Sequence, residues 1–257
     1  MSNEFDSWAE NYDDDFGQNP IGQLLREKVQ AELLKYFPSG SKILEIGCGT
    51  GIDAIFLAQK GFSVTCSDPS EEMLKIVKSK SDKLKIQTIN SQADKLNKVL
   101  TNEDFDGAFS NFGALNCKID LKKLSEILSK TLKAESYFVA VVMGNFCIWE
   151  ILFYSLKLNF GRAFFRFGKS YKDVSLGKDS VPTRYFSPNN FYNLFKTEFE
   201  IEKVLPIGFL LPPPYLSYKF KPQSKVLGFF NKLDKVFNFK FCGKLSDHFL
   251  IALKRRK

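Results

Sequence analysis

The chain has 257 residues, of which 44% are hydrophobic and 26% are charged. This length and mixture fit one large α/β domain, with or without an embedded subdomain, and exclude a disordered, collagenous or coiled-coil chain. The net charge of +8 is unevenly distributed. Residues 1–150 carry 17 Lys/Arg and 22 Asp/Glu (−5), whereas residues 151–257 carry 20 Lys/Arg and 7 Asp/Glu (+13). The second part also contains 17 of the 27 phenylalanines. A basic, aromatic half is typical of an anionic partner, but a compositional bias toward Lys, Asn and Phe is the explanation we favour.

Three features indicate the cellular setting. The N-terminus, Met1–Asp6, is acidic and lacks an apolar core, so we expect no signal peptide. The five cysteines include no CxxC pair and suit a reduced, cytoplasmic protein. The most apolar stretch, Tyr137–Phe160, is interrupted by Gly144 and Glu150 and is too broken for a spanning helix. We expect a cytoplasmic protein, with a peripheral position at the inner face of a membrane left open.

Strands and helices alternate through the first part of the chain. Apolar periodicity and turn residues predict helices over residues 20–37, 52–59, 71–79 and 120–133. Short apolar runs predict strands over residues 42–48, 63–67, 85–90, 105–111 and 137–143. This alternation implies right-handed crossovers and a parallel sheet covered on both faces.

After Gly144 the pattern loosens. We expect a helix over 147–160 that is apolar nearly all round, a short helix over 187–195 and a strand over 198–205. A stiff proline-rich connector at 211–215, a basic amphipathic helix at 225–237 and a closing strand at 247–253 follow. The expected architecture is one α/β domain with a helical insertion.

A glycine-rich turn follows the first predicted strand. Its sequence from Glu45 to Gly51 is EIGCGTG. Glycines permit a tight turn and let the backbone approach a ligand, and the helix that follows presents free N–H groups. The spacing differs from the dinucleotide fingerprint GxGxxG, and no Gly-Lys-Ser/Thr follows as a phosphate loop requires.

Asp68 stands 17 residues after Gly51, at the end of the next predicted strand. Neighbouring parallel strands place their carboxyl ends side by side, where open α/β sheets bind ligands. A carboxylate there can accept both hydroxyls of an adenosine ribose. Asp68 alone could simply lead a helix before Pro69, but its combination with the glycine turn favours a ligand site.

Residues 5–145, with a weaker similarity at 246–254, resemble the class I S-adenosylmethionine-dependent methyltransferases, in particular their small-molecule members of types 11 and 25. The segment ILEIGCGTG (43–51) is similar to the first motif of that family. The other similar segments are DPS (68–70) with ML (73–74), QAD (92–94), FDGAFSNFGALN (105–116) and the lid FDxWAxxYD (5–13). The family fold is a Rossmann-like, doubly wound seven-stranded sheet of order 3-2-1-4-5-7-6 whose last strand, here 247–253, is antiparallel.

The resemblance implies S-adenosyl-L-methionine as cofactor and S-adenosyl-L-homocysteine as product. It implies that Gly47, Cys48 and Gly49 line the methionine part and that Glu45 supports the turn through the cofactor's amino group. It also implies that Asp68 holds the ribose and that the adenine is bordered by Pro69, Ala93 and Asp94. Asn111 and Phe112 would flank the sulfonium, and Tyr12 would close over the cofactor. Singly, Asp94 could be a solvated acid, Asn111 a turn residue and Tyr12 a core residue. Their order along one chain favours the family assignment.

The resemblance also implies one methyltransferase domain over residues 1–257. A lid and helix would occupy 1–37, a cofactor-binding core 38–144, a substrate cap with late sheet elements 145–243, and a closing strand with a basic tail 244–257.

Methyl transfer from a sulfonium is an in-line displacement that mainly needs alignment and desolvation, and alignment can lower a barrier by about 7–11 kcal/mol. We find no HExxH, no GxSxG and no carboxylate cluster with metal-ligand spacing, so we expect no metal. A base is needed only for an acceptor that carries a proton. His248, the single histidine, is the candidate catalytic residue by topology, although a structural role at a strand end is the simpler interpretation.

The resemblance implies that residues 145–243 determine which acceptor is methylated. Eight aromatic residues between positions 146 and 167 lie there, together with Arg162, Arg166 and Lys169. They suit a small-molecule or lipid-like acceptor or an interfacial helix on anionic lipid, and a plain helical cap is the alternative. An RNA methyltransferase is the rival enzyme, supported by the basic tail 254–257. Asn111-Phe112-Gly113-Ala114 stands where a base-methylating tetrad is expected, so we expect no nucleic-acid partner. A non-catalytic cofactor-binding scaffold stays open, as do the acceptor atom and the oligomeric state.

Overall fold

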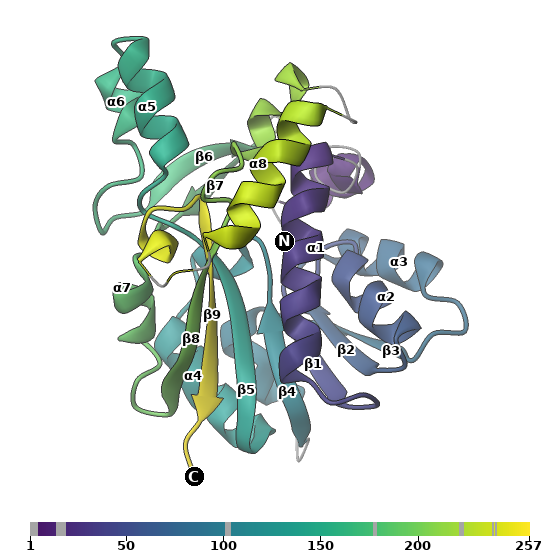
Figure 1. The fold of residues 1–257 in the computed structure, drawn as a ribbon. Helices are drawn as coiled ribbons and strands as arrows, with labels where there is room; N and C mark the ends of the chain where they lie inside the picture. The colour runs from purple at the N-terminus through teal and green to yellow at the C-terminus, as the bar shows by residue number, and fades with distance from the viewer. Residues whose placement is uncertain are drawn as a thin grey trace.

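The computed structural model describes residues 5–13, 19–100, 104–176, 179–220, 224–237, 239 and 241–257. Its main sheet has the order β3-β2-β1-β4-β5-β9-β8, with helices packed on both faces (Figure 1). The strands are β1 (Lys42–Ile46), β2 (Ser63–Asp68), β3 (Ile86–Asn90), β4 (Phe105–Ser110), β5 (Leu132–Met143), β8 (Phe199–Ile207) and β9 (His248–Arg255). β9 is antiparallel to both β5 and β8, and the other pairs are parallel. The predicted fold and strand order are confirmed.

The helices begin where local capping chemistry starts them. They are α1 (Pro20–Tyr36), α2 (Ile52–Gln59), α3 (Glu71–Lys80), α4 (Leu121–Thr131), α5 (Ile148–Leu156), α6 (Phe160–Ala163), α7 (Pro188–Tyr192) and α8 (Lys225–Val236). The side chains of Asn19, Ser70 and Asp120 accept backbone N–H groups in the first turns of α1, α3 and α4. Such caps satisfy amides that the helix itself cannot pair, which is why these boundaries can be recognised in the sequence.

Two apolar layers enclose the sheet. One layer includes Leu25 of α1 and Leu57 of α2, and the other includes Leu124 of α4 and Phe191 of α7. Neighbouring residues of β1 alternate between the layers, as strand geometry requires. Burial on both faces explains the nearly continuous apolar runs that predicted the central strands.

The region after Gly144 differs from the expectation of a purely helical insertion. The predicted helix 147–160 is divided into α5 and α6, because Leu158 has a φ of 55° and the Asn159 side chain caps the second helix through the Arg162 amide. An unpredicted antiparallel hairpin, β6 (Lys172–Leu176) and β7 (Asp179–Thr183), follows. The proline-rich connector leads into a short 3₁₀ helix, Pro214–Lys219. Figure 1 shows α5 and α6 extending beyond the end of the sheet.

In the part of the chain that the structure describes, no helix combines the length and apolarity needed to traverse a bilayer.

Candidate active site

The glycine turn between β1 and α2 has a backbone that only glycine adopts readily. Gly47, Gly49 and Gly51 have φ values of 68°, 53° and 79°. The Gly47 amide donates to the Ser67 carbonyl over 2.8 Å, which joins the turn to β2. A Cβ on Gly47 would lie 2.3 Å from the Cβ of Ala114, in the turn after β4. Backbone conformation and close packing therefore both require glycine at position 47.

Asp68 ends β2 and is already bonded to both neighbouring turns. Its Oδ2 accepts the Gly49 amide and its Oδ1 accepts the Ser70 amide, each at 2.9 Å. Burial raises the pKa of Asp68 to about 6, although these two hydrogen bonds favour the carboxylate. Each carboxylate oxygen accepts more than one hydrogen bond, so the ionised side chain keeps capacity for a ligand.

A narrow recess opens beside the glycine turn. It contains six of the predicted cofactor residues together with four that the sequence did not single out. The lining residues are Tyr12, Arg26, Glu45, Gly47, Cys48, Thr50, Ile52, Asp53, Asn111 and Phe112. Gly49 lies just outside the recess, and a Cβ added to it would lie 3.6 Å from the Tyr12 ring. The fold thus brings the predicted methionine-side and sulfonium-side residues together.

Arg26 and Asp53 are the main additions from the structure. Arg26 on α1 forms an ion pair with Asp53 on α2, and its guanidinium lies 4.8 Å from the Phe112 ring centroid. The Asn111 amide also donates to Asp53, over 2.9 Å, and the buried Asn111 Oδ1 has no hydrogen-bond partner among the residues that the structure describes. Nothing in the sequence marked Arg26, since it precedes the glycine turn by about 20 residues and belongs to no motif.

Burial disfavours the charged forms of two acidic groups on β1 and its turn. Burial raises the pKa of Glu45 well above its usual range, and the Cys66 thiol lies 3.9 Å from its Oε2. A hydrogen bond with Cys66, together with burial, raises the pKa of the Cys48 thiol. Cys48 is therefore a packing residue of the recess rather than a thiolate nucleophile.

The N-terminal 3₁₀ helix (Asp6–Asn11) carries the predicted lid onto the site. Asp6 accepts the Ser70 hydroxyl and Asp13 accepts the Thr50 hydroxyl, which links the lid to the starts of α3 and α2. Burial raises the pKa of Tyr12 to about 12, so its hydroxyl stays protonated. The Tyr12 ring lines the recess and lies next to Gly49 of the glycine turn.

The residues predicted for the adenine lie outside the recess. Ala93 is buried, and the Pro69 carbonyl accepts the Asn90 side-chain amide at 3.0 Å. Asp94 accepts the backbone amide of Asp120 at 3.3 Å and is only half-buried. Their roles stay predictions.

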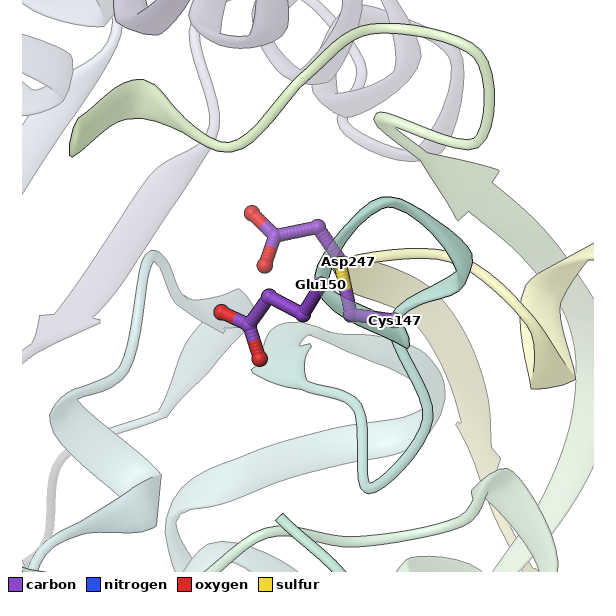
Figure 2. A group of neighbouring side chains, drawn as sticks. All are labelled: Cys147, Glu150 and Asp247. Atoms are coloured by element: carbon purple, nitrogen blue, oxygen red, sulfur yellow. The ribbon is translucent and has the colours of Figure 1, made fainter. Parts of the chain in front are cut away.

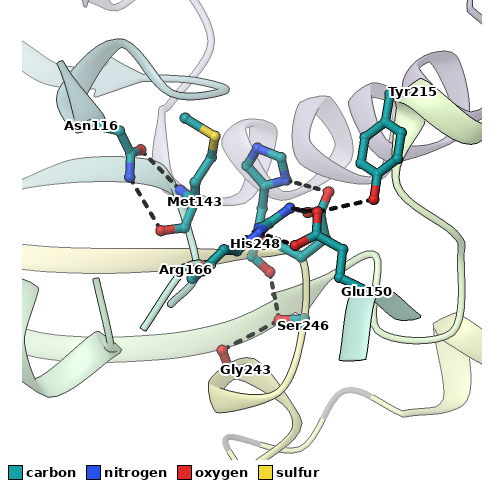
Figure 3. A network of polar contacts seen from close by, with 10 residues as sticks. Asn116, Met143, Glu150, Arg166, Tyr215, Gly243, Ser246 and His248 are labelled. Carbon is teal, nitrogen blue, oxygen red and sulfur yellow. Dashed lines mark hydrogen bonds and ion pairs between the residues drawn. The ribbon is translucent and has the colours of Figure 1, made fainter. Parts of the chain in front are cut away.

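A second polar cluster lies where the cap meets β9 (Figure 3). Nδ1 of His248 is 3.0 Å from Oδ2 of Asp247, and the other oxygen of Asp247 accepts Arg166 at 2.7 Å. Arg166 also binds Glu150 with two nitrogens, at 2.6 and 2.7 Å, and Tyr215 donates to Glu150 at 3.1 Å. Burial alone would raise the pKa of Asp247, but His248 and Arg166 hold it well below the usual range. Asp247 is thus a permanent carboxylate that orients His248.

Cys147, Glu150 and Asp247 come together as a group that could in principle ligate a metal (Figure 2). The buried Arg166 guanidinium binds both carboxylates and already supplies the positive charge that they need. Burial raises the pKa of the Cys147 thiol to about 12, which disfavours the thiolate that a metal would require. The donor chemistry of this group does not fit a metal site.

His248 contacts one wall of the recess, although it is not among the residues that line it. Its ring packs edge-on against Phe112 with centroids 5.7 Å apart, and it pairs with Met143 across β9 and β5. The predicted candidate base and the recess therefore share the wall that Phe112 forms.

Comparison with known proteins supports the same family. A family profile described as a methyltransferase domain matches residues 43–135. YqeM of Bacillus subtilis, a provisionally named methyltransferase, is 29% identical over 155 residues, 57% of this chain and 58% of that protein. A similarly named Geobacillus protein is 40% identical over 79 residues, 30% of this chain and 32% of that protein. The matched segments thus cover 58% of the length of YqeM and 32% of the length of the Geobacillus protein.

Solved structures agree in fold. A methyltransferase from Mesorhizobium loti, described as S-adenosylmethionine dependent, has a TM-score of 0.58 at 16% identity, covering 90% of this chain and 98% of its own. A protein from Listeria monocytogenes, provisionally given the same description, has a TM-score of 0.61 at 17% identity, covering 88% and 96%. In its glycine turn, its strand order and the profile match over residues 43–135, this chain resembles the class I S-adenosylmethionine-dependent methyltransferases.

Proposed function

We propose that this chain transfers a methyl group from S-adenosylmethionine to a small-molecule or lipid-like acceptor. The recess between the glycine turn, Arg26 and Asn111 is the observation that carries the proposal. When bound, S-adenosylmethionine supplies a methyl group activated by its sulfonium. The protein's own contribution is then alignment and exclusion of water, which the buried walls and the lid favour.

The residues present fit this cofactor. Arg26 is a buried cation at the recess and would hold a carboxylate, while an oxygen of Glu45 would accept a hydrogen bond from an amino group. Asp68 has acceptor capacity for two hydroxyls beyond its two backbone bonds. The unpartnered Oδ1 of Asn111 offers one more buried acceptor, whose pairing would remove a desolvation cost.

His248 would serve as the base for an acceptor with a hydroxyl or amine proton. Its Nδ1 faces the ionised Asp247, which favours the tautomer with a proton on Nδ1 and an open lone pair on Nε2. Nε2 would take the acceptor's proton as the oxygen or nitrogen gains the methyl group. Arg166 and Glu150 would act as positioning residues, because Arg166 binds Asp247 and Glu150 binds Arg166.

The test is to incubate the pure protein with S-adenosylmethionine carrying an isotopic methyl label and cell extract divided into water-soluble metabolites, lipids and RNA. Mass spectrometry should find the label in a metabolite or lipid. Label confined to RNA would establish the rival enzyme instead. Calorimetric cofactor binding without label in any fraction would make the chain a scaffold and contradict the proposal.

A further inference from the structure

Helix α5 is apolar along its length, yet none of its residues is buried. Leu152 is 57% exposed, and Leu156, the last residue of the helix, is 86% exposed. The segment that follows adds Leu158 at 80% and Phe160 at 56%. Contiguous exposed side chains of this size usually mark an interaction surface.

A second exposed apolar group lies on α8 and the turn after it. Phe229 is 60% exposed, Val236 is 68% exposed, and Phe239 and Phe241 are each above 60%. The two groups adjoin, because Trp149 of α5 and Phe230 of α8 pack edge-on with centroids 5.8 Å apart. We call residues 152–167 together with residues 226–237, Phe239 and Phe241 the apolar face.

The charge around the apolar face is of one sign. Between Glu150 and Asp173 the sequence has no acid, while Lys157, Arg162 and Lys169 are exposed. In the described part of residues 224–244 the only acid is Asp234, which is fully buried and paired with Lys28 at 2.8 Å. Exposed apolar groups bordered only by cations are the pattern of interfacial segments on anionic lipid.

The position of this face relates it to the active site. Figure 1 shows α5, α6 and α8 beyond the end of the sheet to which β5 leads, the end at which the glycine turn also lies. Arg166, in the turn after α6, joins Glu150 of α5 to Asp247 and so ties the α5–α6 segment beside His248. The apolar face is therefore connected through Arg166 and Asp247 to His248, which contacts one wall of the recess.

We propose that the apolar face docks on the surface of an anionic lipid bilayer, with the leucine and phenylalanine side chains inserted among the lipids and the lysines on the headgroups. A protein partner with an apolar, acidic surface would offer similar chemistry. The bilayer is favoured because the exposed apolar residues belong to separate helices and the exposed charges beside them are cations, which suit anionic headgroups. That the acceptor enters from the bilayer rests on the proposed function, whereas docking itself does not.

The experiment is flotation of the full-length protein, without cofactor, with vesicles of phosphatidylcholine alone or mixed with phosphatidylglycerol. Binding should require phosphatidylglycerol and weaken as salt rises. The double variant Leu156→Ser/Phe160→Ser and the charge reversal Lys157→Glu/Arg162→Glu should each reduce vesicle affinity about tenfold or more. The matched control is Leu34→Ser/Val99→Ser, which changes two exposed apolar residues outside the apolar face and should bind like the parent.

Thermal unfolding and calorimetric cofactor binding of every variant separate docking from folding and from the methyltransferase assignment. Absence of flotation at low salt by a folded, cofactor-binding protein would overturn the docking proposal and leave the proposed function standing. Flotation that is equal on neutral vesicles or unchanged in both double variants would also overturn it. So would sedimentation showing that the chain self-associates through these residues and no longer binds lipid.

Discussion

The backbone amide of Gly49 donates to Oδ2 of Asp68 across 2.9 Å, although the two residues follow different strands. This bond fixes the spacing between the glycine turn and the acid that ends β2. A nucleoside bound to Asp68 would therefore be held against the same turn that shapes the recess. A hydrogen bond within the protein thus orients this part of the site, which reduces the conformational entropy lost on binding.

Replacement of Asp68 by alanine should weaken S-adenosylmethionine binding at least tenfold. The reason is the loss of charge-assisted hydrogen bonds to the ribose, about 1.5–3 kcal/mol. Titration calorimetry measures the effect, and Glu71→Ala, an exposed acid at the start of α3, serves as the matched control. Unchanged affinity in Asp68→Ala would remove Asp68 from the site.

Cofactor affinity should fall as the pH drops through about 6. Burial raises the pKa of Asp68 to about 6, so its acceptor form is lost below that pH, and a competing proton can weaken binding by about tenfold per pH unit. The sign for stability is opposite: the raised pKa means that ionised Asp68 costs the folded state, so its contribution to stability improves as the pH falls from above 6 toward 4. In Asp68→Asn the pH dependence of calorimetric affinity should flatten. A slope that persists would point to Glu45, whose pKa is also raised.

Alanine at Gly47 should be far more damaging than alanine at Gly61. Both residues have positive φ, 68° and 92°, so the backbone strain of about 1–2 kcal/mol is common to both. At Gly47 the new Cβ would lie 2.3 Å from Ala114 Cβ, whereas at Gly61 it would have no neighbour within 4 Å among the described residues. Urea unfolding should show an extra loss of about 1–3 kcal/mol for Gly47→Ala. If both variants lost the same free energy of unfolding, the turn after β4 would have to move away from the new Cβ at little energetic cost.

Replacement of Arg166 by methionine should destabilise the fold by about 3–5 kcal/mol, because Glu150 and Asp247 would be left as buried, unpaired charges. Arg256→Met removes an exposed ion pair with Glu200 and should cost about 1 kcal/mol or less. Chemical denaturation of both variants provides the comparison. A mild effect at Arg166 would show that the cluster rearranges or takes up protons.

Substitution of His248 by asparagine should lower turnover of a proton-bearing acceptor by about 10²–10⁴-fold and leave cofactor affinity within twofold. The chain has one histidine, so nitrogen NMR of the imidazole is unambiguous and should show the proton on Nδ1. Asp247→Asn should disturb that tautomer. Full turnover in His248→Asn, or a proton on Nε2 in the parent protein, would assign His248 a structural role only.

Local sequence patterns were sufficient to predict the main sheet and the part of the site formed by the glycine turn and Asp68. The φ values that demand glycine at 47, 49 and 51, the caps at Ser70 and Asp120, and the apolar runs of the strands each depend on a few neighbouring residues. Parallel topology then placed Asp68 beside the turn without further information. The hairpin β6–β7 was missed because its short strands lack a strong alternating pattern and one contains Pro182.

The sequence by itself thus determined the Rossmann-like sheet, the glycine turn and the acid at the end of β2. Only the tertiary structure decided that Arg26 meets Asp53 at the recess, and that Arg166 reaches Asp247 from 81 residues away to orient His248. Backbone conformation and capping are written in adjacent residues, whereas these ion pairs form only after burial has brought distant segments together. No spacing along the chain records such a meeting, because the path of the whole fold creates it.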